Sequence, residues 1–159
     1  MKILIVYATK TGTTQKCAEI LRQQLENTTL VNLKTKEQEI AEYDCIIIGS
    51  PIRIGMIDKS VKQFITKNKE LLRTKKVAYF ICCGFNDNWK QYYESNIPKE
   101  LLEEAVTYES FGGELDITKQ KGFDKFVVNM VTKNMEQDRE TKILEENIEE
   151  FIKKIKEIH

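Results

Sequence analysis

The first fourteen residues, MKILIVYATKTGTT, join an apolar segment to a turn that is rich in hydroxyl groups. Residues 2–7 form a nearly unbroken apolar, β-branched run without polar alternation. Such a run is typical of a parallel strand covered by helices on both faces. From Thr13 onward, Cys17, Ile20, Leu21 and Leu25 recur at helical spacing. The pattern therefore predicts a buried strand, a polar turn and an amphipathic helix, in that order.

The polar turn has the chemistry of a phosphate-binding loop. It consists of Thr9, Lys10, Thr11, Gly12, Thr13 and Thr14. A helix N-terminus presents unpaired backbone N–H groups and positive dipole, and the four threonine hydroxyls add neutral donors. The alternative is that the threonines only cap the helix, but a single one would suffice for that. Gly12 is the only glycine here, so the nucleoside triphosphate and dinucleotide loop patterns do not fit, and a phosphomonoester suits the loop better.

Length and charge restrict the class of protein. The 159 residues with 41% hydrophobic content predict one domain, residues 1–159, with a substantial core. The 25 basic and 25 acidic residues cancel, so we expect no attraction to nucleic acid or to an anionic membrane. No apolar run reaches the roughly 18 residues of a membrane span, and the N-terminus lacks the layout of a signal peptide. We therefore expect a cytoplasmic protein.

The chain carries few residues for catalysis by side chains alone. Its single histidine is the terminal His159, which leaves no internal partner for a serine or cysteine nucleophile and no zinc site. The four cysteines fall within expected helices and strands, so we expect free thiols and no bound metal. Any redox or catalytic chemistry is expected to come from a bound cofactor.

The rest of the chain repeats the order of strand, loop and helix. The expected further strands are residues 28–33, 43–49, 76–83 and 106–115. The expected further helices are residues 58–72, 97–104 and 143–158, with an additional apolar helical face in residues 122–135. This alternation predicts a doubly wound α/β sheet with right-handed crossovers and helices on both faces.

Three loops follow the carboxyl ends of expected strands, where ligands bind in doubly wound sheets. They are residues 9–14, residues 50–56 and residues 83–89, the last within a segment, 84–93, that we expect to be a polar and aromatic loop. Parallel strands end at the same edge of a sheet, so these loops are expected to meet around one ligand.

The first loop resembles the T/S-x-T-G-x-T phosphate loop of flavodoxins, and the order of later elements extends that resemblance over nearly the whole chain. The resemblance implies a five-stranded parallel sheet of order 2-1-3-4-5, with FMN as the cofactor. It implies that the threonine loop holds the FMN phosphate and that the other two loops border the isoalloxazine ring. The ring contacts expected on this basis are Ser50, Pro51, Ile52, Arg53, Ile54, Gly55, Cys83, Gly84, Phe85, Asn86 and Trp89.

A narrower resemblance concerns the second loop. Ser50, Ile52, Arg53 and Gly55 look like the S-I-R-x-G loop of the flavodoxin-like, quinone-linked protoporphyrinogen dehydrogenases. Residues 112–115 (GGEL) and 122–126 (GFDKF) also resemble segments of that group. This resemblance implies an oxidoreductase that passes electrons from protoporphyrinogen, or a similar small reduced compound, through FMN to a quinone. The alternative is an electron carrier between redox partner proteins, which the short acidic loop after Cys83 favours.

Several residues allow two interpretations. Arg53 could raise the potential of the flavin, or it could be a surface arginine paired with Asp58 or Glu114. Trp89 could stack on the ring or cover the end of a strand. Residues 122–135 could pack in the core or make a peripheral contact with a membrane or an apolar partner. Gly55 could give the second loop the backbone freedom to respond to the redox state of the ring.

Overall fold

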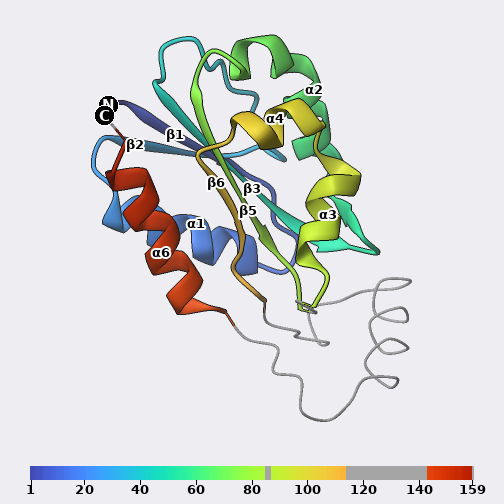
Figure 1. The fold of residues 1–159 in the computed structure, drawn as a ribbon. Coiled ribbons are helices and arrows are strands. Elements are labelled where there is room, and N and C mark those ends of the chain that lie inside the picture. The colour runs from blue at the N-terminus through green and yellow to red at the C-terminus, as the bar shows by residue number, and fades with distance from the viewer. Residues whose placement is uncertain (85–86, 114–142, 159) are drawn as a thin grey trace, which may run out of the picture.

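The computed structural model describes residues 1–84, 87–113 and 143–158 (Figure 1). Its strands are β1 (Ile3–Tyr7), β2 (Thr28–Asn32), β3 (Cys45–Arg53), β4 (Met56–Ile57), β5 (Lys76–Cys82) and β6 (Thr107–Ser110). Its helices are α1 (Thr13–Gln24), α2 (Lys59–Leu72), α3 (Trp89–Asn96), α4 (Lys99–Glu104) and α6 (Glu145–Lys156).

Five of the strands form a parallel sheet in the order β2-β1-β3-β5-β6. Ile5 of β1 lies between Leu30 of β2 and Ile47 of β3, which fixes the register at the centre of the sheet. Counted along the chain without β4, these are strands 2-1-3-4-5. The expected flavodoxin-like order is therefore confirmed.

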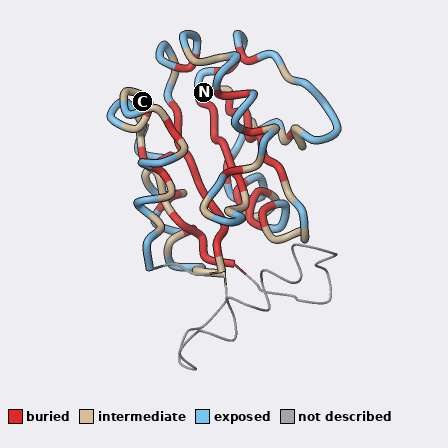
Figure 2. The backbone as a smooth tube through the Cα atoms, turned by 90° about the vertical axis from the view of Figure 1, so that its right-hand side faces the viewer, coloured by how far each residue is buried: buried red, intermediate tan, exposed pale blue. Residues whose placement is uncertain are grey.

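Helices cover both faces of this sheet, α1 and α6 on one and α2, α3 and α4 on the other (Figure 1). Successive residues of β1 enter different cores: Leu4 contributes to the core beneath α2, and Ile3 and Ile5 contribute to the core beneath α1 and α6. Figure 2 shows the buried strands between the more exposed outer elements. Burial on both faces explains why the strands lack polar alternation. None of the helices in the described ranges has the length and apolar content that crossing a bilayer requires.

The second loop differs from the expectation, because residues 50–56 do not break the third strand. β3 continues to Arg53, and β4 returns antiparallel to it, with Ile52 opposite Ile57 and Arg53 opposite Met56. Only two residues, Ile54 and Gly55, remain to make the turn. The expectation was wrong because the segment is apolar enough to extend the strand beyond the sheet, where a hairpin partner supplies its backbone hydrogen bonds.

The third loop is also shorter than expected. The segment 84–93 was expected to be a polar and aromatic loop, but helix α3 begins at Trp89. Tyr93 is buried, and Trp89 and Tyr92 pack against the same core. Positions 89, 92, 93 and 96 have helical spacing, and this signal was present among the polar residues.

The expectations for residues 106–158 can be compared with the structure where residues are described. Residues 106–115 were expected as a strand, and β6 covers Thr107–Ser110 of them. Residues 114 and 115 and the apolar segment 122–135 lie outside the described residues. The terminal helix is confirmed as α6, and Ile148, Phe151 and Ile155 form its buried face.

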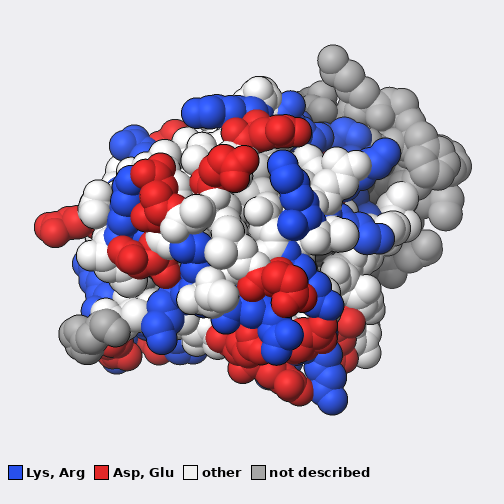
Figure 3. All heavy atoms as spheres, turned by 90° about the horizontal axis from the view of Figure 1, so that it is seen from above, with Lys and Arg blue, Asp and Glu red and all other residues white. Residues whose placement is uncertain are grey.

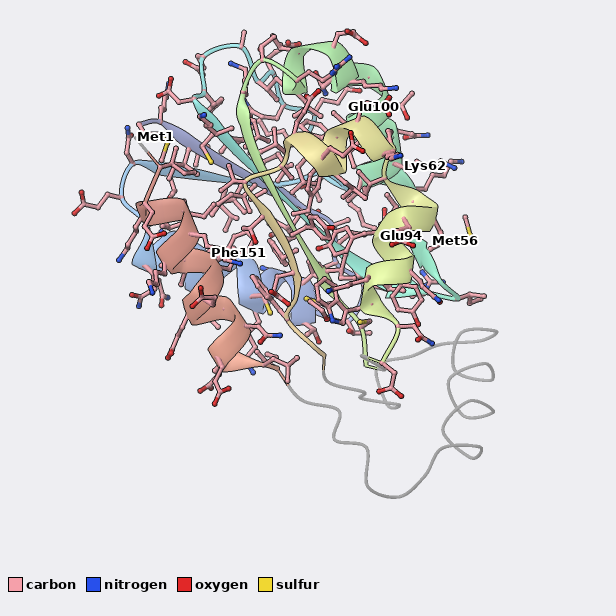
Figure 4. The ribbon with its side chains drawn as sticks, in the orientation of Figure 1. Met1, Met56, Lys62, Glu94, Glu100 and Phe151 are labelled. Carbon is pink, nitrogen blue, oxygen red and sulfur yellow. The ribbon has the colours of Figure 1, made fainter. Side chains whose placement is uncertain are left out.

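Gly49 in β3 makes room for the ring of Phe80 in the neighbouring strand β5. A Cβ atom at Gly49 would overlap the far edge of that ring. Phe80 is 1% exposed and cannot easily move. It stacks on Phe111, with ring centroids 4.7 Å apart, and meets the edge of Phe151, which points from α6 toward the sheet (Figure 4).

We predict that Gly49→Ala lowers the free energy of unfolding by about 1–3 kcal/mol, because the added methyl overpacks a core that cannot relax. Urea unfolding measures this loss. The double variant Gly49→Ala with Phe80→Leu should lose less than the sum of the two single variants, because the smaller side chain vacates the space. Strict additivity would contradict the proposed clash.

Asp58 caps helix α2 at the point where the hairpin ends. Its carboxylate accepts hydrogen bonds from the Ser60 backbone, at 2.9 Å, and from the Ser60 hydroxyl, and it pairs with Lys34 at 3.2 Å. Desolvation by burial acts to raise the pKa of Asp58, but these hydrogen bonds and the lysine charge together lower it below its usual value. Its contribution to stability is therefore complete above about pH 4 and is lost as the pH falls through the lowered pKa.

We predict that the stability difference between wild type and Asp58→Asn narrows as the pH falls below about 4. Asparagine retains an acceptor for the helix cap but has no charge to lose. Urea unfolding of both proteins between neutral and acidic pH gives the difference directly. A difference that stays constant over this range would show that the charge of Asp58 adds nothing to stability.

Candidate functional site

The threonine loop lies at the carboxyl end of β1 and closes on itself. The Ala8 N–H donates to the carbonyl of Gly49 at 3.2 Å, which ties the start of the loop to β3. The Gly12 N–H donates to the hydroxyl oxygen of Thr9 at 3.0 Å, which closes the turn. Gly12 has φ of 99°, a left-handed conformation that favours glycine.

The first turn of α1 is open to a ligand. Gly12 is the N-cap residue and, as a glycine, makes no side-chain cap hydrogen bond. That the threonines bind a phosphate, and do not only cap the helix, stays a prediction. A Cβ atom placed on Gly12 would have no neighbour within 4 Å, so there is free space beside the N-terminal N–H groups. Thr11 and Thr13, on either side of Gly12 in the sequence, are half-buried, which fits a phosphate held by backbone N–H groups and hydroxyls.

Two buried thiols, those of Cys17 and Cys82, lie beneath the threonine loop. Thr14 is buried and hydrogen-bonds Cys82 of β5, whose sulfur lies 3.8 Å from that of Cys17 in α1. The hydrogen bond with Cys17, followed by desolvation, raises the pKa of Cys82 well above its ordinary value. All four cysteines are free and buried, as expected from the sequence. The Cys82 thiol therefore packs as a neutral group beneath the loop.

The hairpin of β3 and β4 carries an unusual backbone. Both turn residues have positive φ, 52° at Ile54 and 73° at Gly55, as in the two-residue turns that suit the twist of a hairpin. Glycine adopts this conformation readily, but a β-branched residue rarely does. Such a residue stores about 1–3 kcal/mol of strain and persists only where surrounding contacts hold it.

Two polar side chains hold this hairpin in place. At its base, the buried Ser50 hydroxyl accepts a hydrogen bond from the Asp58 N–H at 2.8 Å and donates to the carbonyl of Pro51 at 2.9 Å. At its tip, Asn96 of α3 donates to the carbonyl of Gly55 at 2.9 Å and accepts from the Ile57 N–H at 3.2 Å. Asn96 was not singled out in the sequence, because it lies 41 positions from Gly55 and an isolated asparagine gives no local signal.

The outer surface of the hairpin is apolar and borders a hollow. Ile54 is 66% and Met56 is 56% exposed, and Figure 4 shows Met56 at the outer edge of the molecule, near α3. A surface hollow of about 850 Å³ lies between the hairpin and the first turns of α2. Its lining combines apolar hairpin side chains with the basic residues Lys34, Arg53 and Lys59, the acidic Asp58 and the polar Ser60 and Gln63. The hollow therefore offers both apolar and charged contacts to a ligand.

Arg53 is the charged residue of the second loop for which the sequence suggested two roles. Arg53 is exposed on the hairpin. Asp58, which was one possible partner for Arg53, makes an ion pair with Lys34. Glu114, the other, lies outside the described residues. The interpretation of Arg53 as a group that tunes the flavin potential stays a prediction.

The third loop begins at a close approach between two backbones. The Cys83 N–H donates to the carbonyl of Gly112 at 2.9 Å. A Cβ atom on Gly113 would lie only 3.2 Å from the carbonyl carbon of Cys83 and 3.3 Å from the nitrogen of Gly84, so this position favours glycine. Phe85 and Asn86 lie outside the described residues. Trp89 belongs to α3, where its ring meets those of Tyr93 and of Tyr108 in β6 edge-on. A contact between Trp89 and the flavin ring stays a prediction.

The opposite edge of the sheet is different in character. Figure 3 looks onto this edge, where basic and acidic side chains are interspersed. A second hollow of about 850 Å³ lies here, lined by charged residues that include the ion pair of Arg73 and Glu104 at 2.9 Å. It contains none of the residues expected to bind a cofactor. The candidate site is therefore the edge formed by the three loops.

Comparison with known proteins finds flavodoxins and related flavoproteins. The model of the flavodoxin domain matches residues 4–142. A flavodoxin of Synechocystis sp. is 25% identical over 174 residues, covering 99% of this chain and 97% of that protein. Protoporphyrinogen IX dehydrogenase (quinone) of Escherichia coli is 27% identical over 85 residues, covering 50% of this chain and 47% of that protein.

The fold is shared with a solved flavoprotein. The crystal structure of a flavoprotein in complex with FMN from Lactobacillus acidophilus has a TM-score of 0.56 and 17% sequence identity, covering 82% of this chain and 98% of that one. At this identity the likeness concerns the fold alone. The match of the family model to most of the chain decides the family: the protein belongs to the flavodoxin family.

Proposed function

We propose that this protein binds FMN and transfers electrons through it. The observation that carries the proposal is the N-terminus of α1, which follows the carboxyl end of β1, has free space beside its N-cap Gly12 and belongs to a loop with four threonines. A terminal phosphate fits this arrangement. The relationship to flavodoxins and the FMN in the Lactobacillus acidophilus flavoprotein support the choice of cofactor.

Each loop has a separate task in this proposal. The hydroxyls of Thr9, Thr11 and Thr13 and the N–H groups of the first turn of α1 would hold the phosphate. The hairpin from Ser50 to Ile57 and the backbone at Cys83 and Gly84 would border the isoalloxazine ring. When bound, FMN supplies one-electron and two-electron transfer. The residues of the chain position the ring, limit the access of water and set the electrostatic field around it.

We predict that the protein binds FMN but not FAD, and that Thr11→Val with Thr13→Val weakens FMN binding strongly. Each hydrogen bond to a charged group contributes about 1.5–3 kcal/mol, so each lost hydroxyl should reduce affinity by about tenfold or more. Calorimetric titration of the flavin-free protein measures both effects.

A matched control is Thr66→Val on α2, whose hydroxyl donates only to the carbonyl of Lys62 at 2.9 Å. This variant should bind FMN as the wild type does. Unchanged affinity in the double variant would place the phosphate elsewhere, and FAD in the purified protein would contradict the choice of cofactor.

Two physiological roles fit an FMN-binding protein of this shape. An electron carrier is supported by the similarity to the Synechocystis flavodoxin, which extends over nearly the whole of both chains. A dehydrogenase that oxidises protoporphyrinogen or a related compound is supported by the Ser50–Gly55 motif and by the half-length similarity to the Escherichia coli enzyme. The hollow beside the hairpin, whose lining includes apolar and charged side chains, offers a place for such a substrate.

Anaerobic mixing separates these two roles. A dehydrogenase should lose its yellow colour when protoporphyrinogen is added and regain it with a quinone. A carrier should do neither at a comparable rate, but should exchange electrons with a reduced partner protein.

We predict that Arg53→Glu lowers the flavin potential for the step to the fully reduced form, because it places a negative charge where a positive one stood. The shift should shrink as salt is added, since Arg53 is exposed. Lys62→Glu, on the exposed side of α2 (Figure 4), is the matched charge reversal and should have less effect. Spectroelectrochemical titration gives both potentials. Equal shifts in the two variants would show that Arg53 acts only through net charge.

A further inference from the structure

Asn96 joins helix α3 to the hairpin with all the hydrogen-bonding groups of its side-chain amide. Its Nδ2 donates to the carbonyl of Gly55 at 2.9 Å and to that of Tyr92, one turn earlier in α3, at 2.7 Å. Its Oδ1 accepts from the Ile57 N–H at 3.2 Å. Two donors and one acceptor are therefore engaged, and a primary amide has no third donor.

These bonds bracket the strained part of the hairpin. Gly55 is the second turn residue, and Ile57 is the position at which β4 pairs with Ile52. The turn can rotate the peptide after Gly55 only by withdrawing its carbonyl from Asn96. The Tyr92 ring also borders the turn, since it lies 4.0 Å from the position that a Cβ atom of Gly55 would occupy. It therefore leaves the Gly55 backbone little room to move toward α3.

We propose that Asn96 is a positioning residue of the flavin site, which holds the Ile54–Gly55 backbone in one arrangement and so biases the flavin potentials without touching the flavin. The inference rests on the proposed binding of FMN beside this hairpin. Asn96 belongs to a helix outside the three loops that the sequence assigns to the cofactor. Its side chain reaches the hairpin through hydrogen bonds with Gly55 and Ile57.

The first test uses flavin-free protein and the exchange of individual backbone amide hydrogens. Asn96→Ala should speed exchange at Ile57 by about threefold to tenfold, the factor that one lost hydrogen bond represents. Asn68→Ala is the matched control, because Asn68 likewise donates to the carbonyl four residues earlier, that of Phe64, at 2.9 Å. It should leave Ile57 unchanged. Unchanged exchange at Ile57 in Asn96→Ala would overturn the proposal.

The second test measures the two one-electron potentials of the FMN-loaded variants. In Asn96→Ala the hairpin can adjust more easily to the proton that accompanies reduction, so the first potential should rise relative to the second. The expected change corresponds to about threefold to tenfold in the equilibrium between the redox states. Asn96→Gln, which keeps the amide, should recover part of it, and Asn68→Ala should show none.

The two tests separate this inference from the proposed function. Faster exchange with unchanged potentials would overturn the positioning role, since the hairpin would then be clamped but not coupled to the flavin. A wild-type protein that does not bind FMN would overturn the proposed function and, with it, the effect on potentials. The exchange experiment would still decide whether Asn96 clamps the hairpin.

Discussion

Burial of the central strands on both faces is the constraint on which the rest of the structure depends. Every residue of β1 is buried, as are the first six of β3 and the last six of β5. A polar side chain along these strands would lose its contact with water on either face. Charged side chains are therefore restricted to the strand ends, and parallel strands bring their carboxyl ends to one edge. The threonine loop, the hairpin and Cys83 share that edge for this reason.

The aromatic cluster around Phe80 connects this constraint to the candidate site. Phe80 lies over Gly49, and its partner Phe111 meets Phe151 edge-on at 5.2 Å, so the cluster extends from β3 to α6. The carbonyl of Gly49 also accepts the hydrogen bond from Ala8 that fixes the threonine loop. The next residue, Ser50, closes the base of the hairpin. Two consecutive residues, Gly49 and Ser50, thus contribute to the packing of the aromatic cluster and fix the positions of the threonine loop and the hairpin.

The sequence predicted what depends on periodicity and missed what depends on contacts between distant segments. Unbroken apolar runs identified the central strands, and helical spacing identified α1, α2 and α6. The hairpin was missed because Pro51 and Gly55 look like loop residues, whereas they lie in a strand and in a turn stabilised from α3. Helix α3 was missed because seven of its eight residues are not buried. Asn96 could not be found at all, since its importance appears only when α3 packs beside the hairpin.

The hairpin combines local strain with a limited set of stabilising contacts. A β-branched residue at positive φ, as Ile54 is, costs about 1–3 kcal/mol. Each hydrogen bond of Asn96 contributes about 0.5–1.5 kcal/mol, so its two bonds to the hairpin are of similar size to the strain they oppose. The turn is therefore held by a small net free energy. Because the net free energy that holds the turn is small, the addition of one charge or one proton nearby can change the backbone conformation of the turn. A turn of the same length without strain would resist such a change.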